Sequence, residues 1–324
     1  MRIAIIRLSA LGDVIVALSS LPTLKAKYPQ SQIDWFVDER FAPILQNSPY
    51  IDNLYSIPLK RAFSKFDFKA IKGIFSTLSH APEYDKVIDM QGLLKSAILG
   101  KFLKSKTFIG FDWHSIKEPM ASLFYTQKIS IPYEKNILER NEALLQISST
   151  TAHAQAFGFT PQAYERIQSL LSISSQTKVL LVLEASKREK MYPLEQYASL
   201  MELLKNQNFT FFLLSHAYRQ EAQALSQKSG GVLLPPLSLD EVKALVSSVD
   251  IVVGGDTGIT HLAWAMQKPS ITLYGNTPMQ RFLLKGEKNF SLSGNNEANY
   301  QKNDFSIAKI PPKEIADLLI RIRE

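Results

Sequence analysis

Apolar runs of strand length alternate with amphipathic stretches of helix length along the whole chain. Strands that are apolar on both faces, separated by helices, are typical of a parallel sheet covered by helices on both sides. The runs that predict strands are RIAIIRL (2–8), QIDWFVD (32–38), NLYSIPL (53–59), DKVIDM (85–90), KTFIGF (106–111), KVLLVLEA (178–185), FTFFLLS (209–215), VLL (232–234), DIVVGG (250–255) and SITLYG (270–275). The pattern therefore predicts an α/β protein.

The intervals between these runs carry helical periodicity. The first predicted helix covers residues 14–27, and Pro22 is expected to bend or interrupt it because proline lacks the backbone N–H and clashes with the preceding turn. The other predicted helices are 66–78, 93–103, 162–171, 193–207, 218–228, 239–249, 259–267 and 311–324. Most of these helices directly follow a predicted strand, as in a doubly wound sheet.

The pattern stops near Ser148, where the small, polar and aperiodic stretch SSTTAHAQAFGFTP begins, and restarts with KVLLVLEA. A chain of 324 residues is comfortable for two domains of about 150 residues each. Ligands of open α/β sheets bind at the carboxyl ends of the strands, so we expect the two sheets to face an interdomain cleft. The expected parts are a Rossmann-like domain over 1–160, a linker over 161–176, a second Rossmann-like domain over 177–310 and a helix over 311–324 that can pack back on the first domain.

The composition shows an excess of basic residues that is concentrated in one part of the chain. The net charge is +7 and the isoelectric point is 9.3, which indicates attraction to an acidic partner. Two lysine-rich clusters precede residue 110, and solvated helix faces are the alternative interpretation, which we favour for the second cluster. Their members are Lys60, Arg61, Lys65, Lys69 and Lys72, then Lys95, Lys101, Lys104 and Lys106.

The chain contains no cysteine, which excludes disulfides and thiolate chemistry and fits a reducing compartment. It shows no leader-like start and no run of about 20 apolar residues. We therefore expect a cytoplasmic protein. The five histidines are scattered without a metal-ligand spacing, so we expect no metal site.

The stretch SALGDV (9–14) places Gly12 and Asp13 directly after the first buried run. Glycine can turn the chain and aspartate can cap the next helix. Alternatively, Asp13 faces a cleft and accepts a proton. The residues alone leave both interpretations open.

The second half holds a comparable stretch, GGDTGITHL (254–262). Asp256 and Thr257 are good caps for a helix that begins near Gly258, and the free N–H groups of such a helix start bind anions. A diphosphate fits there, although plain capping explains the residues equally well. His261, one turn further on, is either packed or functional.

The loop EASKREKMYP (184–193) follows a predicted strand and carries Lys187, Arg188 and Lys190. Cations at a strand's carboxyl end can neutralise a leaving diphosphate, and a solvated loop is the alternative. Neither GxGxxG nor GxxxxGK[ST] occurs, which counts against a dehydrogenase and a P-loop nucleotidase.

Three motifs together resemble the bacterial lipopolysaccharide heptosyltransferases: SALGDV, DMQGLLKSA (89–97) and GGDTGITHL, in this order. The segment FDWHSIKEPMASLFY (111–125) resembles the type I branch of that family rather than type II. The resemblance runs from Met1 to about Thr277. Each motif alone is weak, but the ordered set is specific.

The resemblance implies a GT-B fold and inverting transfer of L-glycero-D-manno-heptose from ADP-heptose to the Kdo sugar of Kdo-lipid A, without an essential metal. It implies peripheral contact with the anionic inner face of the inner membrane and no nucleic-acid partner. Asp13 takes the place of the family's catalytic base. The implied donor-binding residues are Ser186, Lys190, Glu221, Leu237, Asp256, Thr257, Gly258 and His261. The implied acceptor-binding residues are Lys60, Arg61, Lys65, Lys117 and Arg140.

The chain departs from the family pattern at three places. The family's histidine–alanine–threonine lead-in reads LEAS (183–186), a tryptophan is replaced by Tyr192, and YGNTPM (274–279) stands where YGPTDP is expected. The alternatives are a type II enzyme or another nucleotide-sugar transferase of this family, a nucleotide-sugar epimerase of similar architecture, or a non-catalytic nucleic-acid binder. The last is suggested by the charge alone, since no nucleic-acid-binding module is recognisable.

Overall fold

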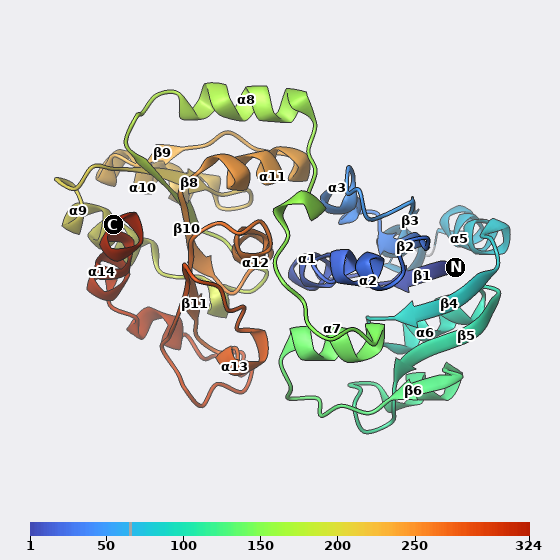
Figure 1. The fold of residues 1–324 in the computed structure, drawn as a ribbon. Coiled ribbons are helices and arrows are strands. Elements are labelled where there is room, and N and C mark those ends of the chain that lie inside the picture. Colours follow the sequence, from blue (N-terminus) through green and yellow to red (C-terminus); the bar gives the residue numbers. More distant parts are fainter. Residues whose placement is uncertain (65–66) are drawn as a thin grey trace. The chain divides into compact units, whose positions relative to one another are not determined.

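The structure, a computed structural model, describes residues 1–64 and 67–324. The chain divides into two compact units, 1–158 and 159–324, coloured blue to green and green to red in Figure 1. Each unit contains a six-stranded parallel sheet, in the orders β3-β2-β1-β4-β5-β6 and β12-β11-β10-β7-β8-β9. Both orders are the 3-2-1-4-5-6 arrangement of doubly wound proteins. The predicted α/β class with two Rossmann-like sheets is confirmed.

The first unit is built around β1, which pairs with β2 on one side and β4 on the other. Its strands are β1 (Arg2–Ile6), β2 (Gln32–Asp38), β3 (Asn53–Ile57), β4 (Tyr84–Asp89), β5 (Ser105–Phe111) and β6 (Gln127–Ile129). Its helices are α1 (Leu11–Leu18), α2 (Leu21–Lys27), α3 (Ala42–Leu45), α4 (Leu59–Ser64), α5 (Phe68–His80), α6 (Leu94–Lys101) and α7 (Ile137–Leu145), with the 3₁₀ turns η1 (Pro119–Phe124) and η2 (Ala154–Ala156). Pro22 lies in the first turn of α2, so the predicted interruption is confirmed.

The second unit repeats this plan around β7, which pairs with β10 and β8. Its strands are β7 (Thr177–Val182), β8 (Phe209–Leu214), β9 (Val232–Leu233), β10 (Ile251–Gly255), β11 (Ser270–Tyr274) and β12 (Asn289–Ser293). Its helices are α8 (Pro161–Leu171), α9 (Leu194–Leu203), α10 (Arg219–Ser229), α11 (Leu239–Ser248), α12 (Gly258–Ala265), α13 (Met279–Phe282) and α14 (Pro312–Arg323), with the 3₁₀ turns η3 (Arg188–Lys190) and η4 (Ser306–Lys309).

Two expectations about the second unit need correction. The expected linker 161–176 contains α8, which packs on α11 through an Arg166–Glu241 ion pair. The C-terminal helix packs within its own unit, because its apolar face, with Ile315 and Leu319, is buried in the core beside α9. Both segments therefore belong to the second unit.

Each sheet has one place where the chain leaves two neighbouring strands in opposite directions, which we call its switch point. In the first unit it lies between β1 and β4, where Ile6 pairs with Asp89. In the second it lies between β7 and β10, where Val182 pairs with Gly254. Ligands of open α/β sheets bind at such points, beyond the carboxyl ends of the strands. No helix within the described ranges is long and apolar enough to cross a membrane.

Candidate active site

Asp13 lies at the switch point of the first unit, in the first turn of α1. Its carboxylate accepts the N–H of Ala10 at 3.2 Å and forms an ion pair with Arg7, with 2.8 Å between Nη2 and Oδ2. The Arg7 side chain is nearly buried and also donates to the carbonyl of Met90, beyond β4. Asp13 is therefore a helix cap and at the same time a partly open carboxylate held by a buried cation.

The loop after β4 fixes the loop that carries Asp13. The side-chain oxygen of Gln91 accepts the N–H groups of Leu8 and Ser9 at 3.1 and 3.0 Å. Asp89, fully buried, anchors this loop in turn by accepting the N–H groups of Gln91 and Gly92 at 2.9 and 3.1 Å. Burial raises the pKa of Asp89 although these hydrogen bonds oppose the shift. The DMQG stretch is thus the support of the SALGDV turn.

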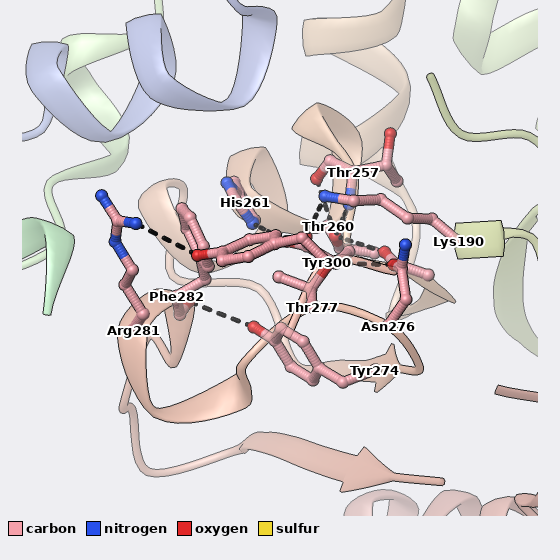
Figure 2. A network of polar contacts seen from close by, with 12 residues as sticks. Lys190, Thr257, Thr260, His261, Tyr274, Asn276, Thr277, Arg281, Phe282 and Tyr300 are labelled. Atoms are coloured by element: carbon pink, nitrogen blue, oxygen red, sulfur yellow. Dashed lines mark hydrogen bonds and ion pairs between the residues drawn. The ribbon is translucent and has the colours of Figure 1, made fainter. Parts of the chain in front are cut away.

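Asp256 lies at the switch point of the second unit, directly after β10. One carboxylate oxygen pairs with the ammonium group of Lys190, and the other lies 3.0 Å from Nε2 of His261. Figure 2 labels both of these partners. Burial alone would raise the pKa of Asp256, but the His261 hydrogen bond and the Lys190 charge outweigh burial and hold this pKa well below its usual range. Each oxygen already has one partner and the side chain is only 4% exposed, although a carboxylate oxygen can accept a second hydrogen bond.

Gly255 makes this arrangement possible. A Cβ atom at this position would lie 2.1 Å from the backbone oxygen of Lys190, far closer than atoms can approach. The absence of a side chain lets η3, which ends at Lys190, lie against the end of β10. The glycine therefore brings the cation of one loop to the carboxylate of the next.

The start of α12 lies beside this pair. Thr257 is its N-cap residue and Gly258 its first helical residue. The hydroxyl of Thr260 donates to the carbonyl of Gly255 at 2.9 Å, which ties the first turn of the helix to the end of β10. The first N–H groups of a helix have no partner within it and carry a partial positive charge. Together with Lys190 they form a site suited to an anion.

Aromatic and polar side chains from the loop after β11 surround Lys190 (Figure 2). The ring centroid of Phe282 lies 6.0 Å from Nζ of Lys190. Asn276 is buried and belongs to the stretch YGNTPM, which differs from the family pattern. Its side chain donates to the carbonyl of Gln301 at 3.1 Å, and its backbone carbonyl accepts the N–H of Tyr300 at 2.8 Å. This difference from the family pattern therefore fixes the neighbouring loop that contains Tyr300 and Gln301.

Glu184 belongs to the stretch LEAS, which differs from the family pattern. It connects the loop after β7 to the loop after β8. It accepts the hydroxyl of Ser215 and the backbone N–H groups of His216, Ala217 and Tyr218. Burial alone would raise the pKa of Glu184, but these hydrogen bonds outweigh burial and lower it. A glutamate thus anchors the start of the lysine loop.

A cavity of about 250 Å³ lies next to this loop. Its lining is mainly apolar and includes Glu221, which the resemblance implied as a donor ligand. The lining residues are Leu183, Arg188, Met191, Tyr192, Pro193, Leu194, Tyr218, Glu221 and Ala222. Leu237 is half-buried ahead of α11 and is not among them, and Ser186 is exposed between β7 and η3.

The implied acceptor residues that the structure describes belong to different elements of the first unit. Lys60 and Arg61 lie on α4, where Arg61 pairs with Glu39 at 3.0 Å. Lys117 is exposed ahead of η1. Lys65 lies outside the described residues.

The side chain of Arg140 makes contacts within the fold. Its side chain is buried on α7 and donates to the carbonyls of Pro132 and Ser115 at 2.9 and 2.7 Å. Its guanidinium also stacks 4.1 Å from the ring centroid of Phe111. These contacts join α7 to the end of β5 and engage the guanidinium within the fold, which argues against the acceptor-binding role that the resemblance implied.

Sequence reasoning missed Arg7 and Glu184. Arg7 follows the buried run IAII, and a charged side chain that is buried requires a partner, so its position carried a signal. Glu184 gave no such signal. Among residues 1–64 and 67–324, no group of three or more His, Cys, Asp or Glu side chains is arranged to hold a metal.

The fold and the two switch points together define a class: a two-unit α/β protein of the Rossmann type, with a partly open carboxylate in the first unit and a lysine beside a helix start in the second. A model of glycosyltransferase family 9 (heptosyltransferase) matches residues 77–309. The chain therefore belongs to glycosyltransferase family 9.

Individual relatives cover nearly the whole chain. Lipopolysaccharide heptosyltransferase 1 of Campylobacter coli is 35% identical, covering 98% of each chain. The protein of that name from Salmonella typhimurium is 32% identical, over 86% of this chain and 89% of the relative. Among solved structures, E. coli heptosyltransferase WaaC with ADP-2-deoxy-2-fluoro heptose matches with a TM-score of 0.79 and 26% identity, covering 99% of each chain.

Proposed function

We propose that the protein transfers L-glycero-D-manno-heptose from ADP-heptose to the Kdo sugar of Kdo-lipid A, with inversion at the anomeric carbon. The observation that carries this proposal is the pair of switch points: one offers a partly open carboxylate and the other offers a cation beside a helix start. Relatives named lipopolysaccharide heptosyltransferase 1 at 31–35% identity support the substrate pair.

The second unit holds the donor in this proposal. Lys190 and the N–H groups at the start of α12 stabilise the diphosphate as it gains charge on leaving. His261 and Asp256 keep the lysine in place, and Thr257 and Gly258 lie closest to the phosphates. The apolar cavity with Glu221 on its wall is suited to the adenosine, with the carboxylate accepting hydrogen bonds from ribose hydroxyls. Ser186 and Leu237 flank this region as further donor contacts.

Asp13 acts as the base. A carboxylate is far too weak to remove a sugar hydroxyl proton in advance. It accepts this proton late, when the oxygen has begun to bond to the anomeric carbon and has become acidic. A nucleoside diphosphate is a good leaving group, so no second carboxylic acid is needed to protonate it, unlike in inverting glycosidases. One carboxylate at the first switch point is therefore sufficient.

Arg7 is a positioning residue in this mechanism. Its buried guanidinium holds Asp13 and is itself held by the carbonyl of Met90. Gln91 fixes the backbone of Leu8 and Ser9. The turn that leads into α1 is therefore held in place, and with it the carboxylate of Asp13. The acceptor hydroxyl then meets a base with a fixed orientation.

The acceptor is anionic and lipid-linked, which accounts for the basic first unit. We propose that Lys60, Arg61, Lys65 and Lys117 attract its carboxylates and phosphates. We further propose that the protein works in the cytoplasm with salt-dependent, peripheral contact at the inner face of the inner membrane.

The test is product formation by mass spectrometry, with purified protein and Kdo-lipid A, and with ADP-heptose, ADP-glucose or UDP-glucose as donors. We expect a single added heptose with ADP-heptose and no product with the other two. Addition to an acceptor that already carries the first heptose, but not to Kdo-lipid A, would replace the proposal by a type II activity. Turnover of a donor without any acceptor would replace it by an epimerase.

A further inference from the structure

One side of the first unit has an unusual outer surface. The chain crosses from β3 to β4 and then continues outward to β5 and β6. Right-handed crossovers place α5, α6 and η1 on the same face of the sheet. Direct contacts agree, because the rings of Phe75 on α5 and Phe102 at the end of α6 lie 5.0 Å apart, and η1 packs on α6. We call this the outer layer: α5, α6 with Phe102, and η1.

The outer layer exposes large apolar side chains. Phe68 is 80% exposed, and Phe75 and Phe102 are each about half exposed although they touch each other. Of the thirteen large apolar side chains exposed in the described part of the chain, six belong to this layer: Phe68, Phe75, Ile98, Phe102, Met120 and Leu123. Apolar side chains gathered on one face of a folded unit mark an interaction surface.

The faces of these helices are rich in positive charge, although Asp67 caps α5 and Glu118, ahead of η1, accepts the N–H of Leu94 at 2.7 Å. Residues 68–82 and 90–111 contain six lysines and no aspartate or glutamate. Lys106 pairs with Asp85. The other five form no ion pair with any described residue; they are Lys69, Lys72, Lys95, Lys101 and Lys104. Lys72 lines a hollow of about 360 Å³ together with Phe75 and Phe102, so cations and phenyl rings share one surface.

We propose that the outer layer is the surface by which this protein binds an anionic phospholipid bilayer. The phenyl rings enter the boundary between headgroups and acyl chains, while the long lysine side chains reach the lipid phosphates. This inference rests on the proposed function, because a lipid-linked acceptor places the enzyme at a membrane. A bilayer fits better than an acidic protein, because the lysines are dispersed over two helices and a loop instead of forming one pocket. Each lysine near an anionic surface strengthens binding about fivefold.

The test is flotation of the full-length protein with vesicles of phosphatidylcholine alone or of equal parts phosphatidylcholine and phosphatidylglycerol. We expect binding to the anionic vesicles that weakens with added salt. The double variant Phe75→Ser/Phe102→Ser should bind these vesicles about tenfold more weakly. The double variant Lys72→Glu/Lys101→Glu should lose about 25-fold or more. Because all four side chains are exposed, circular dichroism and ADP affinity should not change.

The matched control is Leu203→Ser/Lys228→Glu, an exposed apolar residue and an exposed lysine of the second unit. It should bind vesicles as the wild type does. Absence of vesicle binding by the wild type, or an equal loss in the control, would overturn the proposal. Unchanged binding by the phenylalanine variant would also overturn it, as would a change of oligomeric state in that variant, which would assign the surface to a second copy of the chain. No transfer reaction is needed, so this test can fail while the proposed function stands, and the reverse.

Discussion

The two switch points each carry an ion pair, but opposite members of the pair are buried. In the first unit the cation is buried and the carboxylate is open: the exposed fractions are 8% for the Arg7 side chain and 29% for that of Asp13. In the second unit the carboxylate is buried and the cation is more open, with exposed fractions of 4% for Asp256 and 20% for Lys190. The same sheet topology thus presents a partly open carboxylate in one unit and a partly open cation in the other.

The difference shows that one fold exposes the carboxylate of an ion pair in one unit and the cation in the other. Removing one partner of a buried ion pair leaves the other charge uncompensated, which is costly. The buried member therefore acts as a tether, and the open member keeps access to a ligand. From this comparison we derive four predictions, in order of decreasing effect.

The largest effect is expected at Asp13. The variant Asp13→Asn keeps the shape of the side chain but cannot accept the hydroxyl proton, so kcat should fall by about 10²- to 10⁴-fold. Quantification of heptosylated product by mass spectrometry measures this loss. A rate near that of the wild type would mean that Asp13 is a helix cap and nothing more.

A smaller effect with a different signature is expected at Lys190. The variant Lys190→Met removes the charge that meets the leaving diphosphate, so kcat should fall by about 10²- to 10³-fold. ADP should also bind roughly 10- to 100-fold more weakly, the usual cost of one charge-assisted contact. Titration calorimetry measures the affinity.

The neighbouring Lys187→Met is the matched control for that variant, because Lys187 is exposed in the same loop. It should bind ADP nearly as the wild type does. Equal weakening in both variants would show that the loop acts through its net charge and would remove Lys190 from its assigned role.

The third prediction concerns Arg7, the buried cation that holds Asp13 in the first unit. The variant Arg7→Met should lower kcat by about 10- to 100-fold, the scale of a misplaced catalytic group, while the KM for ADP-heptose stays unchanged. Arg7→Lys should recover part of the rate, because a cation again reaches Asp13. Arg2→Met, at the opposite end of β1, serves as the control. An equal loss of rate in the Arg2 variant would reduce Arg7 to a structural residue.

The smallest effect concerns stability at Glu184. Because the folded state lowers the pKa of Glu184, its contribution is present above the pKa of an unfolded glutamate, about 4.3. The contribution is lost as the pH falls through the lower folded value. Glu184→Gln should therefore lower the free energy of unfolding by about 1–2 kcal/mol at pH 7, and by less at pH 3. Thermal unfolding at the two pH values measures the difference, and a penalty that does not shrink at pH 3 would contradict it.

Much of the fold could be predicted, because buried parallel strands are continuous apolar runs. The edge strands β6 and β12 were missed since their side chains are largely half-buried or exposed and show no such run. Helix α7 was also missed. Its buried positions include Arg140 and Asn141, so its inner face does not show the apolar periodicity of an amphipathic helix.

The sequence pointed to the motif residues of the candidate site, but it did not show how they pair. Sequence spacing does not show that the cation of one loop reaches the carboxylate of another, as Lys190 reaches Asp256 across 66 residues. Nor does it distinguish an arginine that faces a ligand from one whose donors are used by backbone carbonyls, as for Arg140.

The most direct test of the central claim is calorimetric titration of ADP into Asp13→Asn and Lys190→Met, side by side with the wild type. If the open carboxylate of the first unit serves the acceptor and the open cation of the second serves the donor, Asp13→Asn should bind ADP as the wild type does, and Lys190→Met should bind it markedly more weakly. Weak binding by Asp13→Asn, or unchanged binding by Lys190→Met, would contradict this division of roles.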